Sequence, residues 1–151
     1  MITRIWHRLS VGSLEDARRL ASANPLGIKT VVSLCPGEVT PRDERIEYVQ
    51  IPIGDSAPIC PKQFDQIMAE IAKSVRRGAV LVHCLEGISR SPLMCAAWMQ
   101  RCGYTSIDAA LAEIADLRPA IDPSPVLLSS IRRLLLPSTY GEGEPNNRGR
   151  R

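Results

Sequence analysis

The sequence predicts a single α/β domain in which a central, mostly parallel sheet carries helices on both faces. Strand-like segments alternate with helix-like segments along the chain, and the continuous apolar run Ala79–Val82 is typical of a parallel strand buried on both sides. The 151 residues, 44% of them hydrophobic, suffice for one core. We expect this domain over residues 1–136. The Pro-, Gly- and Glu-rich residues 137–151 are predicted to be a disordered tail.

The first third of the chain predicts two strands and a helix. Ile5–Val11 mixes apolar and polar residues like an exposed strand. Gly12-Ser13 offers a turn and an N-cap for a helix over Leu14–Ala23, which Asn24-Pro25 ends. The β-branched segment Thr30–Leu34 is typical of a buried strand.

The rest of the chain predicts two strands and four helices. Ile46–Ile53 alternates and contains Pro52, which favours a strand nearer the sheet edge than its centre. A helix with Pro61 in its first turn carries a 3.6-residue apolar stripe from Phe64 to Val75 and ends at Gly78. The buried strand Ala79–Val82 follows, and the last three helices are predicted over Ser91–Cys102, Ser106–Leu117 and Pro123–Leu136.

Composition and charge exclude several classes of protein. The net charge of +3 is too slight and too dispersed to indicate a nucleic-acid surface. No apolar run approaches the length of a membrane span, and Arg4, His7 and Arg8 interrupt the first apolar segment, so no secretory signal is predicted. We therefore expect a cytoplasmic protein that does not enter a membrane.

The five cysteines are interpreted as reduced thiols, because an odd number without a small-scaffold spacing does not indicate a disulfide framework. The two histidines lie far apart in sequence and the cysteines lack paired spacing, so no metal site and no cofactor are predicted. Four cysteines are expected to pack as small hydrophobic residues: Cys35, Cys60, Cys95 and Cys102.

The segment from His83 to Pro92 carries the chemistry. It lies between the predicted central strand and a helix N-terminus, where backbone N–H groups and the helix dipole favour an oxyanion. Such a setting also favours the thiolate form of Cys84. Gly87 allows a tight turn, where a side chain would crowd the anion, and the planar fork of Arg90 can bind two phosphoryl oxygens. The amides of residues 85–90 together with Arg90 can stabilise a phosphoryl transition state.

This segment resembles the phosphate-binding loop of the cysteine-based protein tyrosine phosphatases, and more narrowly that of the dual-specificity phosphatases. The resemblance rests on His83-Cys84-x5-Arg90-Ser91-Pro92, with Glu86 and Gly87 between. It extends upstream through Leu9–Ser13, Gly27–Leu34 and Tyr48–Asp55, and it covers residues 5 to about 135.

The resemblance implies a role for each matching residue. Cys84 is the nucleophile that forms a cysteinyl-phosphate, and Asp55 is the acid that protonates the leaving oxygen. Ser91 helps the thiolate leave in the second step, and His83 fixes the loop and helps to keep the thiol ionised. The phosphate-binding residues are then Leu85, Glu86, Gly87, Ile88, Ser89 and Arg90.

Other interpretations of single residues stay open at this point. Asp55 sits where a loop aspartate commonly makes turn hydrogen bonds, and Asp43 is a second candidate for the acid. Ser91 can be a helix N-cap, and His83 a packed core residue. One of the other cysteines can form a protective disulfide with Cys84 under oxidation, but nothing in the sequence selects which.

The substrate is expected to be a phosphorylated protein, through phosphotyrosine and phosphoserine or phosphothreonine, or a small phosphomonoester. Phosphoinositides, inositol polyphosphates and RNA 5′-phosphates are the alternative substrates. Such polyanions usually need basic residues in the loop, and Leu85, Glu86 and Ile88 supply none. Basic residues elsewhere, such as Arg42 and Arg45, keep this alternative open. A noncatalytic phosphopeptide-binding module would not need Cys84 and an acid together. The physiological substrate and the oligomeric state do not follow from the sequence.

Overall fold

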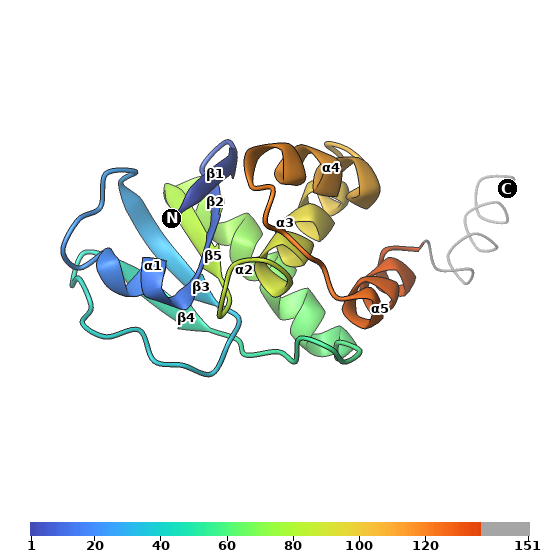
Figure 1. Ribbon diagram of the computed structural model, residues 1–151, viewed down its shortest axis with the longest axis horizontal. Helices are drawn as coiled ribbons and strands as arrows, with labels where there is room; N and C mark the ends of the chain where they lie inside the picture. Colours follow the sequence, from blue (N-terminus) through green and yellow to red (C-terminus); the bar gives the residue numbers. More distant parts are fainter. Residues whose placement is uncertain (137–151) are drawn as a thin grey trace, which may run out of the picture.

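The apolar segments form one five-stranded sheet with the strand order β1-β2-β5-β3-β4 (Figure 1). The structure is a computed structural model, and it describes residues 1–136, so the predicted tail lies outside the described residues. The strands are β1 (Thr3–Trp6), β2 (Leu9–Gly12), β3 (Ile28–Ser33), β4 (Glu47–Gln50) and β5 (Ala79–His83).

The sheet is mostly parallel, as predicted. β2, β5, β3 and β4 run parallel to one another, and only β1 is antiparallel to its neighbour β2. β5 occupies the middle of the sheet, and Val80, Leu81 and Val82 are fully buried. This confirms the prediction that the continuous apolar run Ala79–Val82 is a parallel strand buried on both faces.

Five helices follow from local signals in the sequence. Ser13 and Asp16 form a reciprocal capping box at the start of the first helix, and Ser106 caps another through a hydrogen bond from the Ala109 amide. The helices are α1 (Leu14–Arg19), α2 (Pro61–Arg77), α3 (Arg90–Arg101), α4 (Ile107–Leu117) and α5 (Pro125–Leu135). Within the described residues, none of them is long and apolar enough to span a membrane.

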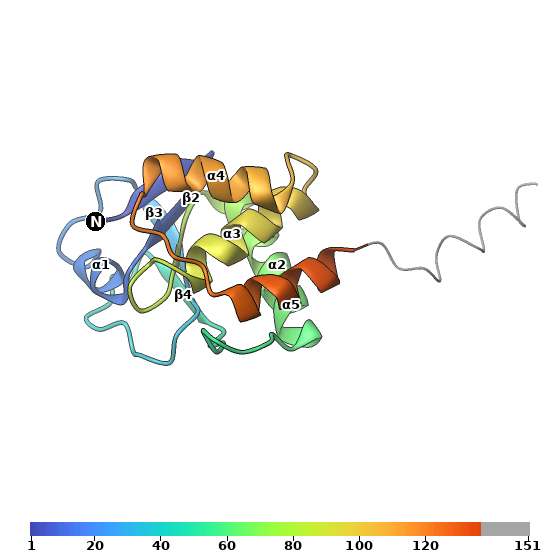
Figure 2. The same ribbon diagram turned by 45° about the vertical axis from the view of Figure 1, so that its right-hand side comes forward.

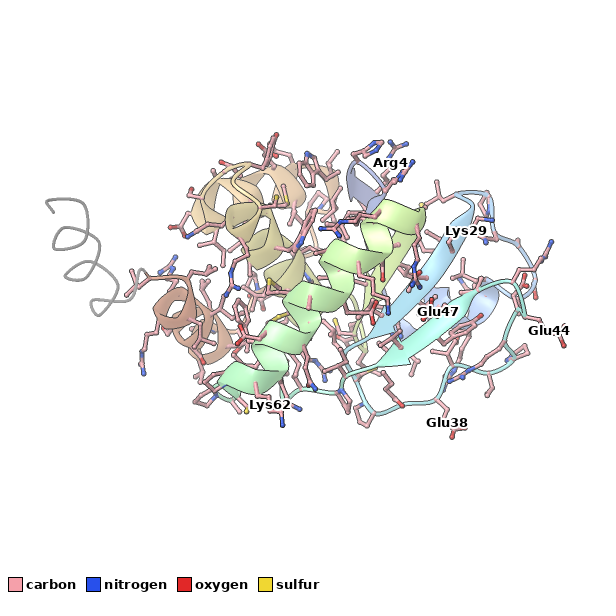
Figure 3. All side chains as sticks on the ribbon, turned by 180° about the vertical axis from the view of Figure 1, so that it is seen from behind. Arg4, Lys29, Glu38, Glu44, Glu47 and Lys62 are labelled. Atoms are coloured by element: carbon pink, nitrogen blue, oxygen red, sulfur yellow. The ribbon has the colours of Figure 1, made fainter. Side chains whose placement is uncertain are left out.

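The helices cover the two faces of the sheet unequally. Short α1 lies alone on one face, in front of the sheet in Figure 1, where Leu14 and Ala17 pack with Val31 and Leu81. Helix α2 crosses the opposite face, as the reverse view in Figure 3 shows. Helices α3, α4 and α5 share that larger core, whose buried members include Val32, Val80, Phe64, Leu93, Ile114 and Ile131. The prediction of helices on both faces is thus confirmed.

The margin of the sheet is formed by β4 and the loop before it. In Figure 3, Glu47 lies on β4, and Glu38 and Glu44 lie along the outer rim of the loop that joins β3 to β4. An ion pair of 2.8 Å between Arg77 and Glu47 ties the last turn of α2 to this strand. The edge position predicted from Pro52 is confirmed, although the strand ends at Gln50 rather than Ile53.

The prediction of one exposed strand over Ile5–Val11 is wrong. The segment is a hairpin in which Arg8 takes a left-handed conformation (φ 58°) between β1 and β2. All four residues of β2 are buried, because the strand lies between β1 and β5. Polar Ser10, which gave the segment its exposed pattern, is itself buried.

Candidate active site

The predicted site residues gather at the carboxyl ends of the parallel strands. Gly12, His83 and Ser33 are register partners in one row across β2, β5 and β3. The loop from Cys84 to Ser89 leaves β5 at this edge and enters α3. A cavity of about 80 Å³ lies there, lined by Asp55, Cys84, Leu85, Glu86, Ile88, Ser89 and Arg90. The structure therefore brings together Asp55 and the loop, which lie about thirty residues apart in sequence.

Five consecutive carbonyl groups of this loop accept hydrogen bonds from groups that surround it. Cys84 O contacts Nδ1 of His83 at 3.1 Å, and Leu85 O accepts from the Leu14 amide at 3.1 Å. The carbonyls of Glu86 and Gly87 accept from Arg118, and Ile88 O accepts from the Asp122 amide at 2.7 Å. Every carbonyl from residue 84 to residue 88 thus has a partner outside the cavity.

The orientation of the carbonyl groups determines where the amides point. In a trans peptide the C=O of one residue and the N–H of the next point in opposite directions, and each peptide of this loop is trans. The N–H groups of residues 85–89 therefore point away from these partners, and four of the five residues line the cavity. Within the described residues these five amides donate to no protein acceptor. An oxyanion in the cavity would provide their acceptors.

The side chain of Arg90 supplies positive charge at the same place. Its Nη1 donates to the carbonyl of Ile53 at 3.1 Å, which links the end of the loop to the segment that precedes Asp55. Its Nε is buried and has no hydrogen-bond partner among the described residues. A buried guanidinium N–H without an acceptor is costly unless a ligand completes it. This unpaired N–H therefore also points to an oxyanion ligand.

Cys84 and Ser91 are in direct contact. The Cys84 thiol lies 3.3 Å from the Ser91 hydroxyl, and both side chains are buried. Helix α3 begins at Arg90 with Ser89 at its N-cap position, so the Ser91 hydroxyl does not cap the helix. When the sulfur is a thiolate, which can only accept, the Ser91 hydroxyl is the donor of this contact.

His83 is fully buried and holds the backbone of Cys84. Its Nδ1 lies 3.1 Å from the Cys84 carbonyl, which can only accept, so Nδ1 carries the proton. Its Nε2 lies 2.6 Å from the hydroxyl of Ser33. Burial lowers the pKa of His83. The hydrogen bond to Cys84 acts in the opposite direction, and the positive charges of Arg18 and Arg90 lower the pKa further. The neutral ring thus accepts from Ser33 and donates to the loop.

The two candidate acids lie in different places. Asp55 lines the cavity beside Cys84. Asp43 lines a separate hollow with Asn24 and Ile28, the first residue of β3, and its carboxylate is paired with Arg45 at 2.9 Å. The hydrogen bonds from Arg45 lower the pKa of Asp43, so this carboxylate holds a proton less readily. The geometry thus favours Asp55 over Asp43.

Gly87 has the backbone conformation expected of the tight turn, but a side chain on it would meet atoms other than the anion. Its φ of +73° favours glycine, and a Cβ built on it would lie 2.7 Å from the backbone of Gly12 and 2.6 Å from Nη2 of Arg118. These atoms lie behind the loop. A side chain here would therefore collide with the support of the loop rather than crowd the anion.

The remaining cysteines divide into two groups. Cys35 and Cys95 are buried as predicted, whereas Cys60 and Cys102 are exposed, because they lie just outside the ends of α2 and α3. No cysteine is in a disulfide. Burial raises the pKa of Cys95, and the neighbouring Cys84 adds to the shift. Among residues 1–136, no three His, Cys, Asp or Glu side chains gather as metal ligands.

Outside α3, five residues that form hydrogen bonds with residues 84–89 or with the His83 ring were not predicted to do so from the sequence: Leu14, Ser33, Arg118, Asp122 and Ser124. Ser33 is the one with a usable signal, because parallel pairing of the two buried strands places their last residues side by side. Arg118 and Asp122 lie in the connection between α4 and α5, where the sequence indicated only that Pro119 separates two helices.

Comparisons with known proteins find one family across most of the chain. Residues 9–134 match the family described as the dual specificity phosphatase catalytic domain. A probable dual specificity protein phosphatase of Dictyostelium discoideum is 31% identical over 136 residues, which are 87% of this chain and 34% of that protein. Dual specificity protein phosphatase 18 of Rattus norvegicus is 33% identical over 119 residues, or 77% of this chain and 57% of the rat protein.

Solved structures show the same fold. The crystal structure of human DUSP28 superposes with a TM-score of 0.77 at 24% identity, covering 89% of this chain and 95% of that one. The chain spans about a third to three fifths of the length of the two curated relatives above. The match over residues 9–134 nevertheless includes every residue of the candidate site. The chain belongs to the dual specificity phosphatase family.

Proposed function

We propose that this protein hydrolyses phosphomonoesters through a cysteinyl-phosphate intermediate. The observation that carries the proposal is the set of amides at residues 85–89 without protein acceptors among the described residues, together with the unpaired Nε of Arg90, beside a cavity that Cys84 lines. Donors fixed in this way stabilise the charge on the three equatorial oxygens during phosphoryl transfer.

The reaction proceeds in two steps. The Cys84 thiolate attacks phosphorus, the bond to the leaving oxygen breaks, and protonated Asp55 gives its proton to that oxygen. A water then attacks the cysteinyl-phosphate, the Asp55 carboxylate takes a proton from the water, and the P–S bond breaks. Inorganic phosphate leaves, and the hydrogen bond from Ser91 at 3.3 Å stabilises the released thiolate.

Phosphorylated proteins are the proposed substrates. The cavity of about 80 Å³ is small, and its lining residues include exposed Leu85 and acidic Glu86, whose negative charge would repel additional phosphates. Two other arginines of this region are already engaged: Arg18, whose charge acts on His83, donates to Glu38 O, and Arg118 donates to Gly87 O. A small pocket with one guanidinium supports a single phosphoryl group on a protein side chain. The catalytic relatives named above are protein phosphatases by name.

A phosphoinositide is the second candidate. A structure of PTPMT1 in complex with PI(5)P shares the fold with a TM-score of 0.72 at 20% identity. Such a substrate presents several anionic groups and calls for basic side chains around the cavity. The engaged arginines weigh against it in this chain.

A substrate panel with active-site variants tests the proposal. Wild-type protein should release phosphate from an aryl phosphate and from phosphotyrosine, phosphoserine and phosphothreonine peptides more efficiently than from phosphoinositides or RNA 5′-triphosphates. Cys84→Ser should abolish turnover while vanadate still binds. A Cys84→Ser protein that retains the wild-type rate would exclude the mechanism, and binding of phosphopeptides without wild-type turnover would indicate a binding module.

Asp55→Asn tests the acid, with Asp43→Asn as the matched control. Loss of a positioned acid should slow turnover by roughly 10²- to 10⁴-fold for poor leaving groups, and the fall of the rate at high pH should disappear. Asp43→Asn should leave both unchanged. The reverse pattern would assign the acid to Asp43.

A further inference from the structure

One guanidinium joins the back of the candidate phosphate loop to the start of the chain. Arg118, the C-cap residue of α4, donates from Nε to the Gly87 carbonyl at 2.8 Å and from Nη2 to the Glu86 carbonyl at 3.5 Å. Its Nη1 donates to the Met1 carbonyl at 2.6 Å and to Thr3 Oγ1 at 2.9 Å. Arg118 does not line the cavity, so it acts on the loop from behind.

Two more contacts come from the same connection between α4 and α5. The Asp122 amide donates to the Ile88 carbonyl at 2.7 Å, and the Ser124 amide donates to Ser89 Oγ at 2.9 Å. Figures 1 and 2 both show this connection running past the loop at the start of α3. Residues 118–124, here called the brace, thus hold four successive loop residues, 86–89.

The brace acts on the amides that face the cavity. Because each peptide unit is rigid, a donor that holds the carbonyls of Glu86 and Gly87 also fixes the N–H groups of Gly87 and Ile88 in the opposite direction. Without Arg118, these two peptide units lose their external partner and can rotate. Each rotation would replace an inward N–H by an inward C=O, which repels an oxyanion.

We infer that Arg118 is a positioning residue for oxyanion binding and phosphoryl transfer. This inference rests on the proposed function, and it adds that the arrangement of the loop amides depends on a residue outside the Cys84-x5-Arg90 segment. A lysine cannot replace it, because a single ammonium cannot bridge the loop carbonyls and the Met1 carbonyl as the flat, forked guanidinium does.

The experiment compares Arg118→Ala and Arg118→Lys with Arg132→Ala. Arg132 is the matched control, because it is an arginine of α5 that pairs with Asp108 at the surface and is absent from the cavity lining. The readouts are kcat and KM for an aryl phosphate, the vanadate inhibition constant and the Tm of each protein. Vanadate is the probe of oxyanion binding.

Arg118→Ala should weaken vanadate binding and lower kcat/KM together, by roughly 100-fold if the amides shift by about 1 Å. Added guanidinium at millimolar concentration should partly restore vanadate binding and kcat/KM in Arg118→Ala but not in Arg118→Lys. Arg132→Ala should match wild type. A role in stability alone would lower Tm but leave the vanadate constant and KM of the folded protein unchanged, and that result would overturn the inference.

Two further outcomes separate the inference from the proposed function. If wild-type protein turns over no phosphomonoester, the proposed function fails, and vanadate titration followed through the amide NMR signals of residues 85–89 still decides the role of Arg118. If Arg118→Ala does not fold, Arg118→Lys decides, because it keeps the long side chain and the charge. Wild-type vanadate affinity in folded Arg118→Lys would refute the requirement for a guanidinium.

Discussion

Replacing Gly87 by alanine should damage the site from behind. At φ +73° the new Cβ would lie 2.7 Å from the carbonyl carbon and oxygen of Gly12 and 2.6 Å from Nη2 of Arg118. Arg118 can move only by giving up its bonds to Gly87 and Met1. The Gly12 atoms in question are backbone atoms at the end of buried β2, so they cannot move without disturbing the sheet.

The loss in the free energy of unfolding caused by Gly87→Ala has two parts. A non-glycine residue in the left-handed region loses roughly 1–2 kcal/mol. Relieving the overlap with Gly12 and Arg118 adds roughly 1–3 kcal/mol, as for overpacking in a core. The sum is about 2–5 kcal/mol in the free energy of unfolding, which corresponds to roughly 4 °C in Tm for each kcal/mol in a domain of this size.

Gly103→Ala is the control that separates the two parts. Gly103 has a similar φ of +84°, but a Cβ there would meet no atom within 4 Å, so only the backbone cost of roughly 1–2 kcal/mol applies. Urea unfolding of both variants should show Gly87→Ala less stable by about 1–3 kcal/mol. Its kcat/KM should fall by roughly 100-fold, while Gly103→Ala keeps the wild-type value. Equal stability losses with an unchanged kcat/KM would refute the reasoning.

Three other predictions concern residues in contact with the loop or with His83. Ser91→Ala should slow the second step more than the first, because the Cys84 thiolate then leaves without its hydroxyl partner. Stopped-flow measurements of Ser91→Ala should show a burst of the leaving group. A linear trace for both Ser91→Ala and wild type would contradict this prediction. His83 has a lowered pKa, so the unfolded chain binds the proton more readily and stability falls as pH drops below the unfolded value of about 6.5. Between pH 7.5 and pH 5.5, the free energy of unfolding in urea should fall more for wild type than for His83→Gln. Equal falls in the two proteins would contradict the lowered pKa of His83. Ser33→Ala should cost roughly 1–3 kcal/mol in urea unfolding at pH 7.5 by leaving the buried Nε2 of His83 without a partner. A stability equal to that of wild type would show that the contact is dispensable.

The sequence predicts best what is local. The central strand, the tight loop and the start of α3 follow from an apolar run, a glycine and a proline within fifteen residues, and the structure places them as expected. Asp55 is predicted to join them only through the family resemblance, because its side chain reaches the cavity from a different strand end.

The contacts behind the loop could not be predicted in this way. Arg118 lies 31 residues from Gly87 and 117 from Met1, and no periodic pattern relates positions so far apart. The hairpin of β1 and β2 does not follow from the sequence for a similar reason. Whether Leu9–Gly12 is exposed depends on β5, which lies some seventy residues later in the chain and covers one of its edges.

The brace also ties the formation of the pocket to the folding of the whole domain. Apart from the local contact of His83 with Cys84, the partners of the loop carbonyls come from residues 14, 118 and 122, so most of the loop has no short-range contacts that could organise it early. Contacts of such large sequence separation form only after long segments of chain have been closed. Oxyanion binding should therefore be among the last properties to appear during refolding, and it can serve as a sensitive reporter that every layer of the domain is in place.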